Sequence, residues 1–329
     1  MTISTSSPPQ RLTVITPRTD TQLEDFASDV AAGLAGNPKR LSCSYFYDRE
    51  GSLLFEEICD LPEYYLTRAE AEILRQRAGE VGSRLAAGTT LVELGSGSAA
   101  KTRILIEVLL SRQDTLRYVP VDISRSMLEE TSLALLESYP ALHVTAIAGE
   151  YADGLRQLQA MSEESKLILW LGSNVGNFER PDAAEFLRGV RDTMSPQDRI
   201  LVGIDLRKDR RVLEPAYDDS RGVTARFNLN ILARINRELG GHFDLTAFRH
   251  RALYNEGAGR IEMYLVSARP QRVAIDRLWL EVPFATGEAI HTENSYKYSV
   301  IEMETLAEAA GLETEARWLD AGDRFSVNL

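Results

Sequence analysis

Cysteine is almost absent from this chain of 329 residues, which holds only Cys43 and Cys59. Two cysteines cannot supply a disulfide framework for a chain of this length, so a reducing compartment is expected. The four histidines are scattered without the short spacing of a zinc site, and few cysteines are available to join them. We therefore expect a cytoplasmic protein that binds no metal.

Long hydrophobic runs and an excess of positive charge are absent too. The longest apolar runs, such as 167–171, are far shorter than the roughly 20 residues that a membrane span needs. Residues 1–18 are rich in serine, threonine and proline and contain no apolar segment, so we do not expect a signal peptide. Acidic residues outnumber basic ones by 49 to 37, and the resulting net charge of −12 would repel nucleic acids and anionic membranes.

The middle of the chain alternates short apolar runs with segments of helical periodicity. Continuous apolar runs, rather than alternating ones, are typical of strands that are buried on both faces. Between them, 103–110 and 126–138 carry apolar residues at helical spacing. The runs that predict strands are 90–94, 118–121, 144–148, 167–171 and 200–204. This alternation predicts the α/β class, with a doubly wound, parallel, Rossmann-like sheet.

The regular alternation ends after Asp205. Residues 207 to about 255 look largely helical, and the later elements expected are strands at 260–268 and 279–282, a helix at 302–310 and a strand at 325–329. The predicted organisation is a flexible tail over 1–20, a substrate-binding lobe from 21–67 and 207–297, and a cofactor-binding domain from 68–206 and 298–329. The second lobe would cover the carboxyl ends of the strands, where open α/β sheets bind ligands. Because this lobe can cover the cleft without a partner, we expect a monomer.

A glycine-rich loop, 93–102, lies between the first of these strands and the next helix. A P-loop would need its second glycine where Ala100 stands, which disfavours a triphosphate ligand. Gly95, Gly97 and Ala100 do fit the dinucleotide fingerprint G-x-G-x-x-G/A, which would suit a nicotinamide-dependent dehydrogenase. The loop equally fits an S-adenosylmethionine (AdoMet) site, because glycine has no Cβ to obstruct close approach of the cofactor.

Residues after the next two strands favour AdoMet without settling the choice. Asp122, at the end of the second strand, can accept hydrogen bonds from both ribose hydroxyls. Glu150 and Tyr151, after the third strand, can flank the adenine. An acid after the second strand is expected in a dinucleotide site as well. The local pattern leaves three classes open: an AdoMet-dependent methyltransferase, a dehydrogenase and a non-catalytic AdoMet-binding protein.

From about Tyr45 to the C-terminus, the sequence resembles the histidine Nα-methyltransferases of ergothioneine biosynthesis. The resemblance is carried by many short blocks in a fixed order, most of which are absent from generic methyltransferases. The blocks are 45–48, 51–52, 61–65, 67–70, 91–97, 101–103, 172–173, 176–177, 216–219, 222–224, 227–228, 260–263, 292–293 and 295. The resemblance implies a class I methyltransferase fold, AdoMet as co-substrate, and a small-molecule substrate.

The resemblance also assigns residues to the site. It implies that Tyr47 lies against the methyl donor and the substrate amine, in a catalytic orienting role. It implies that Tyr64 and Asn177 contact the amino acid and that Tyr217 hydrogen-bonds its carboxylate. The residues implied around the imidazole are Met263, Glu293 and Ser295, and those implied at AdoMet are Tyr47, Gly95, Gly97, Lys101, Asp122, Glu150 and Tyr151.

The implied reaction is methylation of the α-amino group of L-histidine, three times, to give hercynine (N,N,N-trimethylhistidine) in the first step of ergothioneine biosynthesis. The residue types agree with it, because an imidazole N–H can donate to Glu293 and the Ser295 hydroxyl can orient the ring. An apolar amino acid would leave Glu293 unpaired. An Nα-methyltransferase for another amino acid is the main alternative. The chain departs from the family pattern at Glu150 and Tyr151, where Asp-Phe is usual, and at Leu66, which replaces a common proline.

Overall fold

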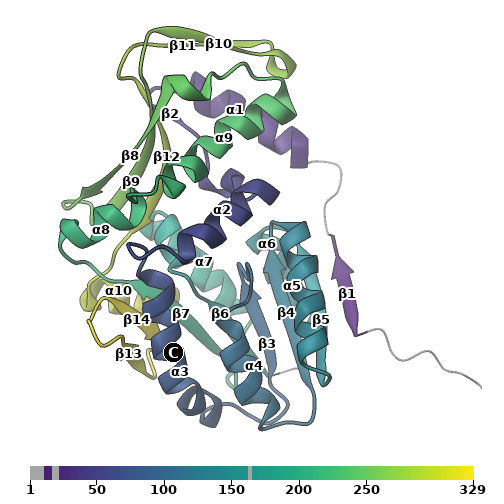
Figure 1. The fold of residues 1–329 in the computed structure, drawn as a ribbon. Coiled ribbons are helices and arrows are strands. Elements are labelled where there is room, and N and C mark those ends of the chain that lie inside the picture. The colour runs from purple at the N-terminus through teal and green to yellow at the C-terminus, as the bar shows by residue number, and fades with distance from the viewer. Residues whose placement is uncertain (1–10, 17–21, 162–164) are drawn as a thin grey trace, which may run out of the picture.

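The structure is a computed structural model that describes residues 11–16, 22–161 and 165–329. The chain forms two lobes, one around a large sheet and one around a smaller sheet (Figure 1). The large sheet lies in the lower part of the view in Figure 1, and the smaller sheet lies above it with α1 (Gln22–Ala35) and α9 (Val223–Leu239). None of the described helices is both long enough and apolar enough to cross a membrane.

The large sheet has eight strands in the order β1-β5-β4-β3-β6-β7-β14-β13. Neighbouring strands are parallel from β1 to β7, whereas β14 is antiparallel to both β7 and β13. The strands are β1 (Leu12–Ile15), β3 (Thr90–Leu94), β4 (Leu116–Asp122), β5 (Leu142–Ala148), β6 (Lys166–Trp170), β7 (Arg199–Asp205), β13 (Arg317–Leu319) and β14 (Phe325–Asn328). The five strands predicted from the apolar runs are all present. The doubly wound, Rossmann-like sheet is therefore confirmed.

Helices cover both faces of this sheet, and each face has its own apolar cluster. Leu91 of β3 packs in the cluster that contains Leu105, whereas the next residue, Val92, packs in the cluster that contains Leu187. The helices of this lobe are α3 (Leu66–Ser83), α4 (Thr102–Leu110), α5 (Arg125–Ser138), α6 (Tyr151–Ala160), α7 (Arg180–Asp192) and α10 (Val300–Ala310). Because both faces of the central strands are buried, these strands carry mostly apolar residues.

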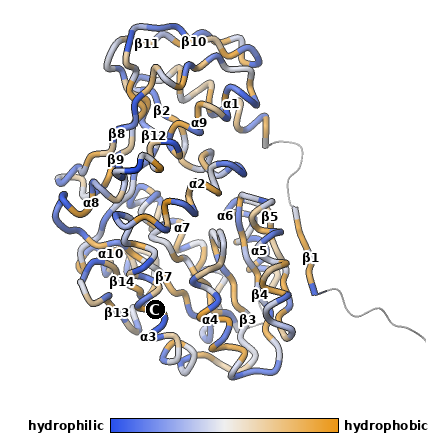
Figure 2. The backbone as a smooth tube through the Cα atoms, in the orientation of Figure 1, coloured by the Kyte–Doolittle hydropathy of each residue, from blue (hydrophilic) through white to orange (hydrophobic). Residues whose placement is uncertain are grey.

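The smaller sheet has the order β2-β12-β9-β8, and a separate hairpin joins β10 to β11. The strands are β2 (Lys39–Arg40), β8 (Phe248–Asn255), β9 (Arg260–Ser267), β10 (Gln271–Ile275), β11 (Leu280–Phe284) and β12 (Ala289–Tyr296). The helices beside this sheet are α1, α9, α2 (Arg49–Cys59) and α8 (Arg210–Tyr217). The short 3-10 turns among the described residues are η1 (Cys43–Phe46), η2 (Asn174–Asn177), η3 (Leu245–Ala247) and η4 (Asp276–Leu278). Figure 2 shows hydrophobic segments along the strands and helices of the large-sheet lobe, and hydrophilic segments along the outer β10–β11 hairpin.

After β7 the chain leaves the large-sheet lobe, and it re-enters this lobe beside the point of departure. Leu206, which follows β7, forms a parallel bridge with Tyr298, which lies just beyond β12. The Tyr298 N–H donates to the Asp205 carbonyl (3.1 Å), and the Arg207 N–H donates to the Tyr298 carbonyl (3.0 Å). The ends of β7 and β12 therefore lie side by side, so both sheets can contribute residues to one pocket.

Two segments differ from the sequence-based expectation. Leu12–Ile15, expected within a flexible tail over 1–20, forms β1 and pairs in parallel with residues 144–147 of β5. The rest of that expected tail, apart from Arg11 and Thr16, lies outside the described residues. Residues 248–255, expected to be helical, form β8 and pair with β9 along their whole length. The sequence of β8 is too polar to indicate a strand. Its conformation is determined by pairing with β9 and not by an apolar pattern.

Candidate active site

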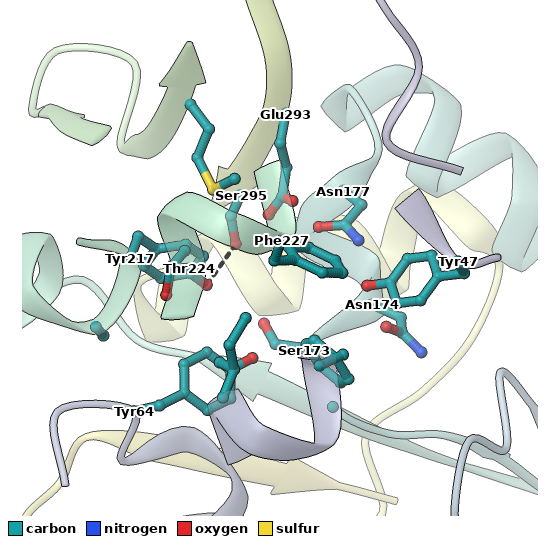
Figure 3. Close-up of a pocket in the computed structure, with 15 residues that line it drawn as sticks. Tyr47, Tyr64, Ser173, Asn174, Asn177, Tyr217, Thr224, Phe227, Glu293 and Ser295 are labelled. Atoms are coloured by element: carbon teal, nitrogen blue, oxygen red, sulfur yellow. Dashed lines mark hydrogen bonds between the residues drawn. The ribbon is translucent and has the colours of Figure 1, made fainter. Parts of the chain in front are cut away.

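A pocket lies between the two lobes, beyond the carboxyl ends of β6 and β7. Its volume is about 470 Å³ including the open mouth, which suits a small molecule. In Figure 3 the labelled side chains surround this space from several elements. The lining residues are Tyr47, Phe55, Ile58, Tyr64, Gly172, Ser173, Asn174, Asn177, Ala216, Tyr217, Thr224, Phe227, Met263, Glu293 and Ser295. The structure thus brings together Tyr47 and all six residues that the sequence assigned to the substrate.

Glu293 and Ser295 occupy alternate positions of β12, so their side chains project from the same face of the strand. On the neighbouring β9, Met263 is the direct partner of Glu293 in the ladder. The register is irregular between His291 and Glu293. Irregularities of this kind re-aim side chains and are frequent beside active sites. Here the irregularity immediately precedes the residues that face the pocket.

The Glu293 carboxylate accepts no hydrogen bond from any of the described residues. Burial raises the pKa of Glu293 to about 7, and the charge of Lys297 opposes this shift. A carboxylate withdrawn from water without a donor is electrostatically unfavourable. A ligand N–H that donates to Glu293 would therefore be bound favourably.

The hydroxyls of Tyr217 and Ser295 lie 2.9 Å apart, as the dashed line in Figure 3 marks. Lys297 donates to both of them, at 2.7 Å to Tyr217 and 3.0 Å to Ser295. The same ammonium lies 2.8 Å from the Asp205 carboxylate, and both members of this ion pair are fully buried. Burial alone would lower the pKa of Lys297, but Asp205 and Tyr217 raise it above its ordinary value. Lys297 is therefore a cation that holds two pocket hydroxyls.

The backbone of Tyr217 is fixed from the other side by His250. The Nε2–H of His250 donates to the Tyr217 carbonyl at 2.8 Å, while Nδ1 accepts from the Asn228 amide at 2.9 Å. Burial lowers the pKa of His250, which favours the neutral ring that this arrangement needs. Asp219 accepts hydrogen bonds from the backbone N–H groups that begin α9. The segment that joins α8 to α9 is thus held rigidly at the pocket wall.

Aromatic rings form another wall. Tyr47 follows η1 and meets Phe55 and Phe227 edge to face, with ring centroids 5.7 Å apart in both pairs. Tyr64 meets Phe55 and Tyr217 edge to face, at 6.1 Å in both pairs. Burial raises the pKa of Tyr47 well above its ordinary value. The Tyr47 phenol therefore stays protonated at neutral pH.

Asn177 reaches the pocket at the end of η2, which follows β6. Gly172 and Ser173, just before η2, both have positive φ angles, 74° and 60°. Gly176 passes so close to β12 that an added Cβ would lie 2.7 Å from the Tyr296 carbonyl oxygen. Only glycine permits this approach, and the approach places Asn177 beside the β12 residues of the pocket.

The glycine loop after β3 has positive φ angles at both glycines that the sequence assigned to the cofactor. Gly95 and Gly97 have φ angles of 77° and 48°, which glycine adopts without strain. A Cβ on Gly95 would lie 2.8 Å from the Asn174 amide nitrogen and 3.0 Å from the Tyr151 hydroxyl. The Asp122 carboxylate accepts hydrogen bonds from the backbone N–H groups of Gly97 and Ser124, each at 2.9 Å. Ser124 is the residue just before α5. These bonds fix the carboxylate and leave lone pairs for ribose hydroxyls, so the residues present fit the cofactor.

Lys101 lies between the glycine loop and the turn before η2. It forms an ion pair with Glu70, a fully buried carboxylate. Glu70 also accepts the Gly172 N–H, at 2.9 and 3.0 Å to its two oxygens. Burial would lower the pKa of Lys101, but Glu70 raises it above its ordinary value. The structure therefore provides a fixed cation at the junction of the two loops.

Glu150 and Tyr151 stand at the β5–α6 junction. Glu150 is exposed and caps α6 through a reciprocal capping box with Asp153. The ring of Tyr151 packs against Phe186 with a centroid distance of 5.3 Å, and its hydroxyl points toward Gly95. Tyr151 thus borders the loop expected to hold AdoMet, while the adenine contacts of both residues stay predictions.

Sequence reasoning missed several residues at this site. Phe55 and Ile58 on α2, and Thr224 and Phe227 on α9, line the pocket at a spacing of three, the spacing of one helix face. Thr224 is a buried polar residue, so α9 brings a hydroxyl to this wall as well as an aromatic ring. Lys297 follows Ser295 by two positions, just beyond the end of β12, and its contact with Asp205 of the large sheet has no signal in the sequence. The missed residues are Phe55, Ile58, Gly172, Ser173, Asn174, Ala216, Thr224, Phe227 and Lys297.

Comparison with known proteins gives a family match over most of the chain. The family described as "Histidine-specific methyltransferase, SAM-dependent" matches residues 26–329. A "Histidine N-alpha-methyltransferase" of Mycolicibacterium smegmatis is 41% identical over 310 residues, which cover 94% of this chain and 96% of that protein. The protein of the same name in Mycobacterium tuberculosis is 43% identical over 301 residues, 92% of this chain and 93% of its own length.

A fungal relative is longer than this chain. "Ergothioneine biosynthesis protein 1" of Neurospora crassa is 35% identical over 301 residues, which cover 89% of this chain but 33% of that protein. The chain therefore corresponds to about a third of the fungal protein.

Proposed function

Because this chain belongs to the family of histidine-specific, SAM-dependent methyltransferases, we propose that it methylates the α-amino group of L-histidine three times. The product is hercynine, and the reaction begins ergothioneine biosynthesis. The names of the bacterial relatives and of the fungal relative support this activity. The family match excludes the dehydrogenase and the non-catalytic binding protein, the two alternatives that the glycine loop alone had left open.

On the substrate side, the roles follow from hydrogen-bonding chemistry. The imidazole N–H donates to Glu293, whose carboxylate has no other donor among the described residues. Tyr217 hydrogen-bonds the substrate carboxylate, Tyr64 and Asn177 contact the amino acid, and Ser295 contacts the ring. Met263, cross-strand from Glu293, supports the apolar face of the imidazole. These assignments are supported by the gathering of all the side chains in one pocket.

On the cofactor side, the loop of Gly95 and Gly97 gives AdoMet close access to the backbone, and Asp122 accepts the ribose hydroxyls. Lys101 supplies a positive charge beside the loop, where it is held by Glu70. Glu150 and Tyr151 border the adenine. The positive φ angles of both glycines, and the open space beside Gly97, where nothing lies within 4 Å of an added Cβ, support this placement.

AdoMet supplies a methyl group already activated on a sulfonium centre, so the residues of the chain mainly orient the attacking amine. The amine must be neutral to attack. Tyr47 keeps its proton, because burial raises its pKa. It therefore orients the amine through its phenol group and does not act as a phenolate base. Water takes the proton that the amine loses, and the aromatic wall of Phe55 and Phe227 keeps Tyr47 in place.

The observation that carries this proposal is the unpaired Glu293 carboxylate, placed beside the Tyr217–Ser295 hydroxyl pair in a pocket between the two lobes. The decisive experiment incubates the purified protein with AdoMet and L-histidine and follows the products by mass spectrometry. Successive gains of one, two and three methyl groups are expected. If another amino acid from a mixed pool is methylated and histidine is not, the chain is an Nα-methyltransferase for that amino acid, and the proposed substrate is wrong. No transfer to any amino acid would overturn the activity.

We further expect a monomer, because the second lobe can cover the carboxyl ends of the large sheet without a partner, and a cytoplasmic location, because the chain has only two cysteines. Light scattering of the purified protein tests this expectation. A dimer that persists on dilution would contradict it.

A further inference from the structure

The Tyr47 hydroxyl lines the pocket but has no hydrogen-bond partner among the described residues. In Figure 3 it points into the space that the labelled side chains surround. The backbone of Tyr47, with φ −91° and ψ 47°, is neither helical nor extended, so no regular element holds the residue. Its ring meets Phe55 of α2 and Phe227 of α9 edge to face. The direction of the phenol therefore depends on how these two helices and the chain beside Tyr47 are fixed.

The next residue, Asp48, joins the two helices. Its Oδ1 caps α2 by accepting the Gly51 N–H at 2.7 Å, and it also accepts the side-chain amide of Asn230 at 2.8 Å. Its Oδ2 forms an ion pair with Arg237. Asn230 and Arg237 both belong to α9 and lie about two turns apart, on one face of that helix. Asp48 therefore links the start of α2 to α9, one residue away from Tyr47.

Close packing around Gly51 holds this junction together. A Cβ on Gly51 would lie 1.7 Å from the Phe46 carbonyl oxygen and 3.1 Å from the Asn230 amide nitrogen. The ring of Phe46 in turn packs on Phe227, with a centroid distance of 4.7 Å. The residues on both sides of Tyr47 thus lie directly against α9.

The bonds of Asp48 are of the strong kind. Only 11% of its side chain is exposed, and hydrogen bonds to a carboxylate that is largely withdrawn from water are stronger than those between neutral groups. Without them, α2 and α9 would shift relative to each other and would carry Phe55 and Phe227 with them. Both rings contact Tyr47, so the phenol would move as well.

We propose that Asp48 is a positioning residue for methyl transfer, which holds the Tyr47 phenol at the reacting amine by fixing α2 and α9 around it. This inference rests on the proposed function, in which Tyr47 orients the α-amine of L-histidine. Asp48 does not line the pocket, so it acts through Tyr47 and not on the substrate. A displacement of about 1 Å at a reacting group can lower the rate by roughly 100-fold.

The first test is Asp48→Ser. Serine is about as good as aspartate at capping a helix, so α2 keeps its cap, but the carboxylate that receives Arg237 is lost. We expect kcat for histidine to fall by about 10- to 100-fold. The Kd of histidine in the presence of S-adenosylhomocysteine should change by less than about threefold, because Asp48 does not contact the pocket.

Asp244→Ser is the matched control. Asp244 lies in the same lobe, caps η3 through the Thr246 N–H at 3.0 Å and forms an ion pair with Arg269 at 2.8 Å. It thus has the same two kinds of partner as Asp48, but none of them borders Tyr47. We expect this variant to keep the wild-type kcat.

The second test repeats Asp48→Ser in a Tyr47→Phe protein. If Asp48 acts through the phenol, its loss should lower kcat less than about threefold once the phenol is absent. A merely structural role would give the same fold-loss in both backgrounds, and that outcome overturns the inference. A wild-type kcat in Asp48→Ser, or an equal loss in Asp244→Ser, overturns it too.

If Asp48→Ser does not fold, Asn230→Ala decides, because it removes the buried link to α9 and leaves the cap of α2 intact. A loss of kcat in this variant that disappears in the Tyr47→Phe background supports the inference, and an unchanged kcat overturns it. Failure of the wild-type protein to methylate histidine would instead count against the proposed function.

Discussion

Glu293 of β12 and Met263 of β9 are direct partners across the ladder of the smaller sheet. The pair places a carboxylate and a soft apolar side chain next to each other on the pocket wall. An imidazole has the same combination of a polar edge and an apolar face. This relationship makes Glu293 the residue whose change most directly tests the substrate pocket.

Glu293→Gln should raise the KM for histidine by roughly 10- to 100-fold, because a hydrogen bond to a charged group contributes about 1.5–3 kcal/mol. AdoMet binding, measured by calorimetry, should be unchanged. Glu281→Gln is the control, since Glu281 is an exposed carboxylate of the same lobe that pairs with Arg272 on the outer hairpin. Equal loss of histidine and AdoMet binding in Glu293→Gln would contradict the placement.

The same carboxylate should make stability depend on pH. Burial raises the pKa of Glu293 from 4.5 to about 7, so the folded protein binds this proton more tightly than the unfolded chain. Between these values the folded state holds more protons, and its stability falls as the pH rises. Glu293→Gln should therefore stabilise the ligand-free protein by about 1–3 kcal/mol at pH 8 and much less at pH 4. Thermal denaturation at both pH values measures this, and a gain of equal size at both would refute it.

Gly176→Ala should displace the turn that carries Asn177 and so distort the pocket. The new Cβ would meet the Tyr296 carbonyl oxygen at 2.7 Å and the Tyr296 nitrogen at 3.2 Å, so η2 must move away from β12 and carry Asn177 with it. We expect a loss of kcat/KM for histidine of about tenfold or more. Gly79→Ala is the matched control: nothing lies within 4 Å of its added Cβ, and alanine favours the α3 helix by about 1 kcal/mol. Unchanged kinetics in Gly176→Ala would mean that the close approach does not position Asn177.

Asp122→Asn should weaken AdoMet binding by roughly 10-fold or more, because an amide has one acceptor oxygen where the carboxylate has two. Isothermal titration with AdoMet measures the change. Asp114→Asn, in the exposed loop before β4, removes the same charge at the opposite end of the strand and should bind AdoMet normally. If both variants bind AdoMet equally well, Asp122 does not hold the ribose.

The sequence predicted the large sheet well because its strands are buried on both faces. Burial on both faces favours largely apolar strands, and β3 to β7 all have such sequences. The smaller sheet was only partly foreseen. The sequence of β12, from Ala289 to Tyr296, is largely polar, and two of its polar residues, Glu293 and Ser295, line the pocket. The strand that carries Glu293 and Ser295 therefore has no apolar signature.

The candidate site was predictable only through family resemblance. Tyr47, Asn177 and Glu293 are far apart in sequence, and no local pattern joins them. Lys297 escaped because its role depends on Asp205, which belongs to the other sheet. A contact between two sheets cannot be inferred from the spacing within either one.

The bridge between Leu206 and Tyr298 has an evolutionary consequence. The segment between these two residues begins and ends beside the carboxyl end of β7, so it has the geometry of an insertion. An inserted segment of this kind can change in sequence, or be exchanged with that of another enzyme, without a change in the strand order of the Rossmann-like sheet. Diversification of the accepted amine can then proceed in the inserted segment while the methyl-donor half stays unchanged. A chimaera joined at this bridge would transfer Tyr217, Met263, Glu293 and Ser295 together, while Tyr47, Tyr64 and Asn177 would stay with the recipient.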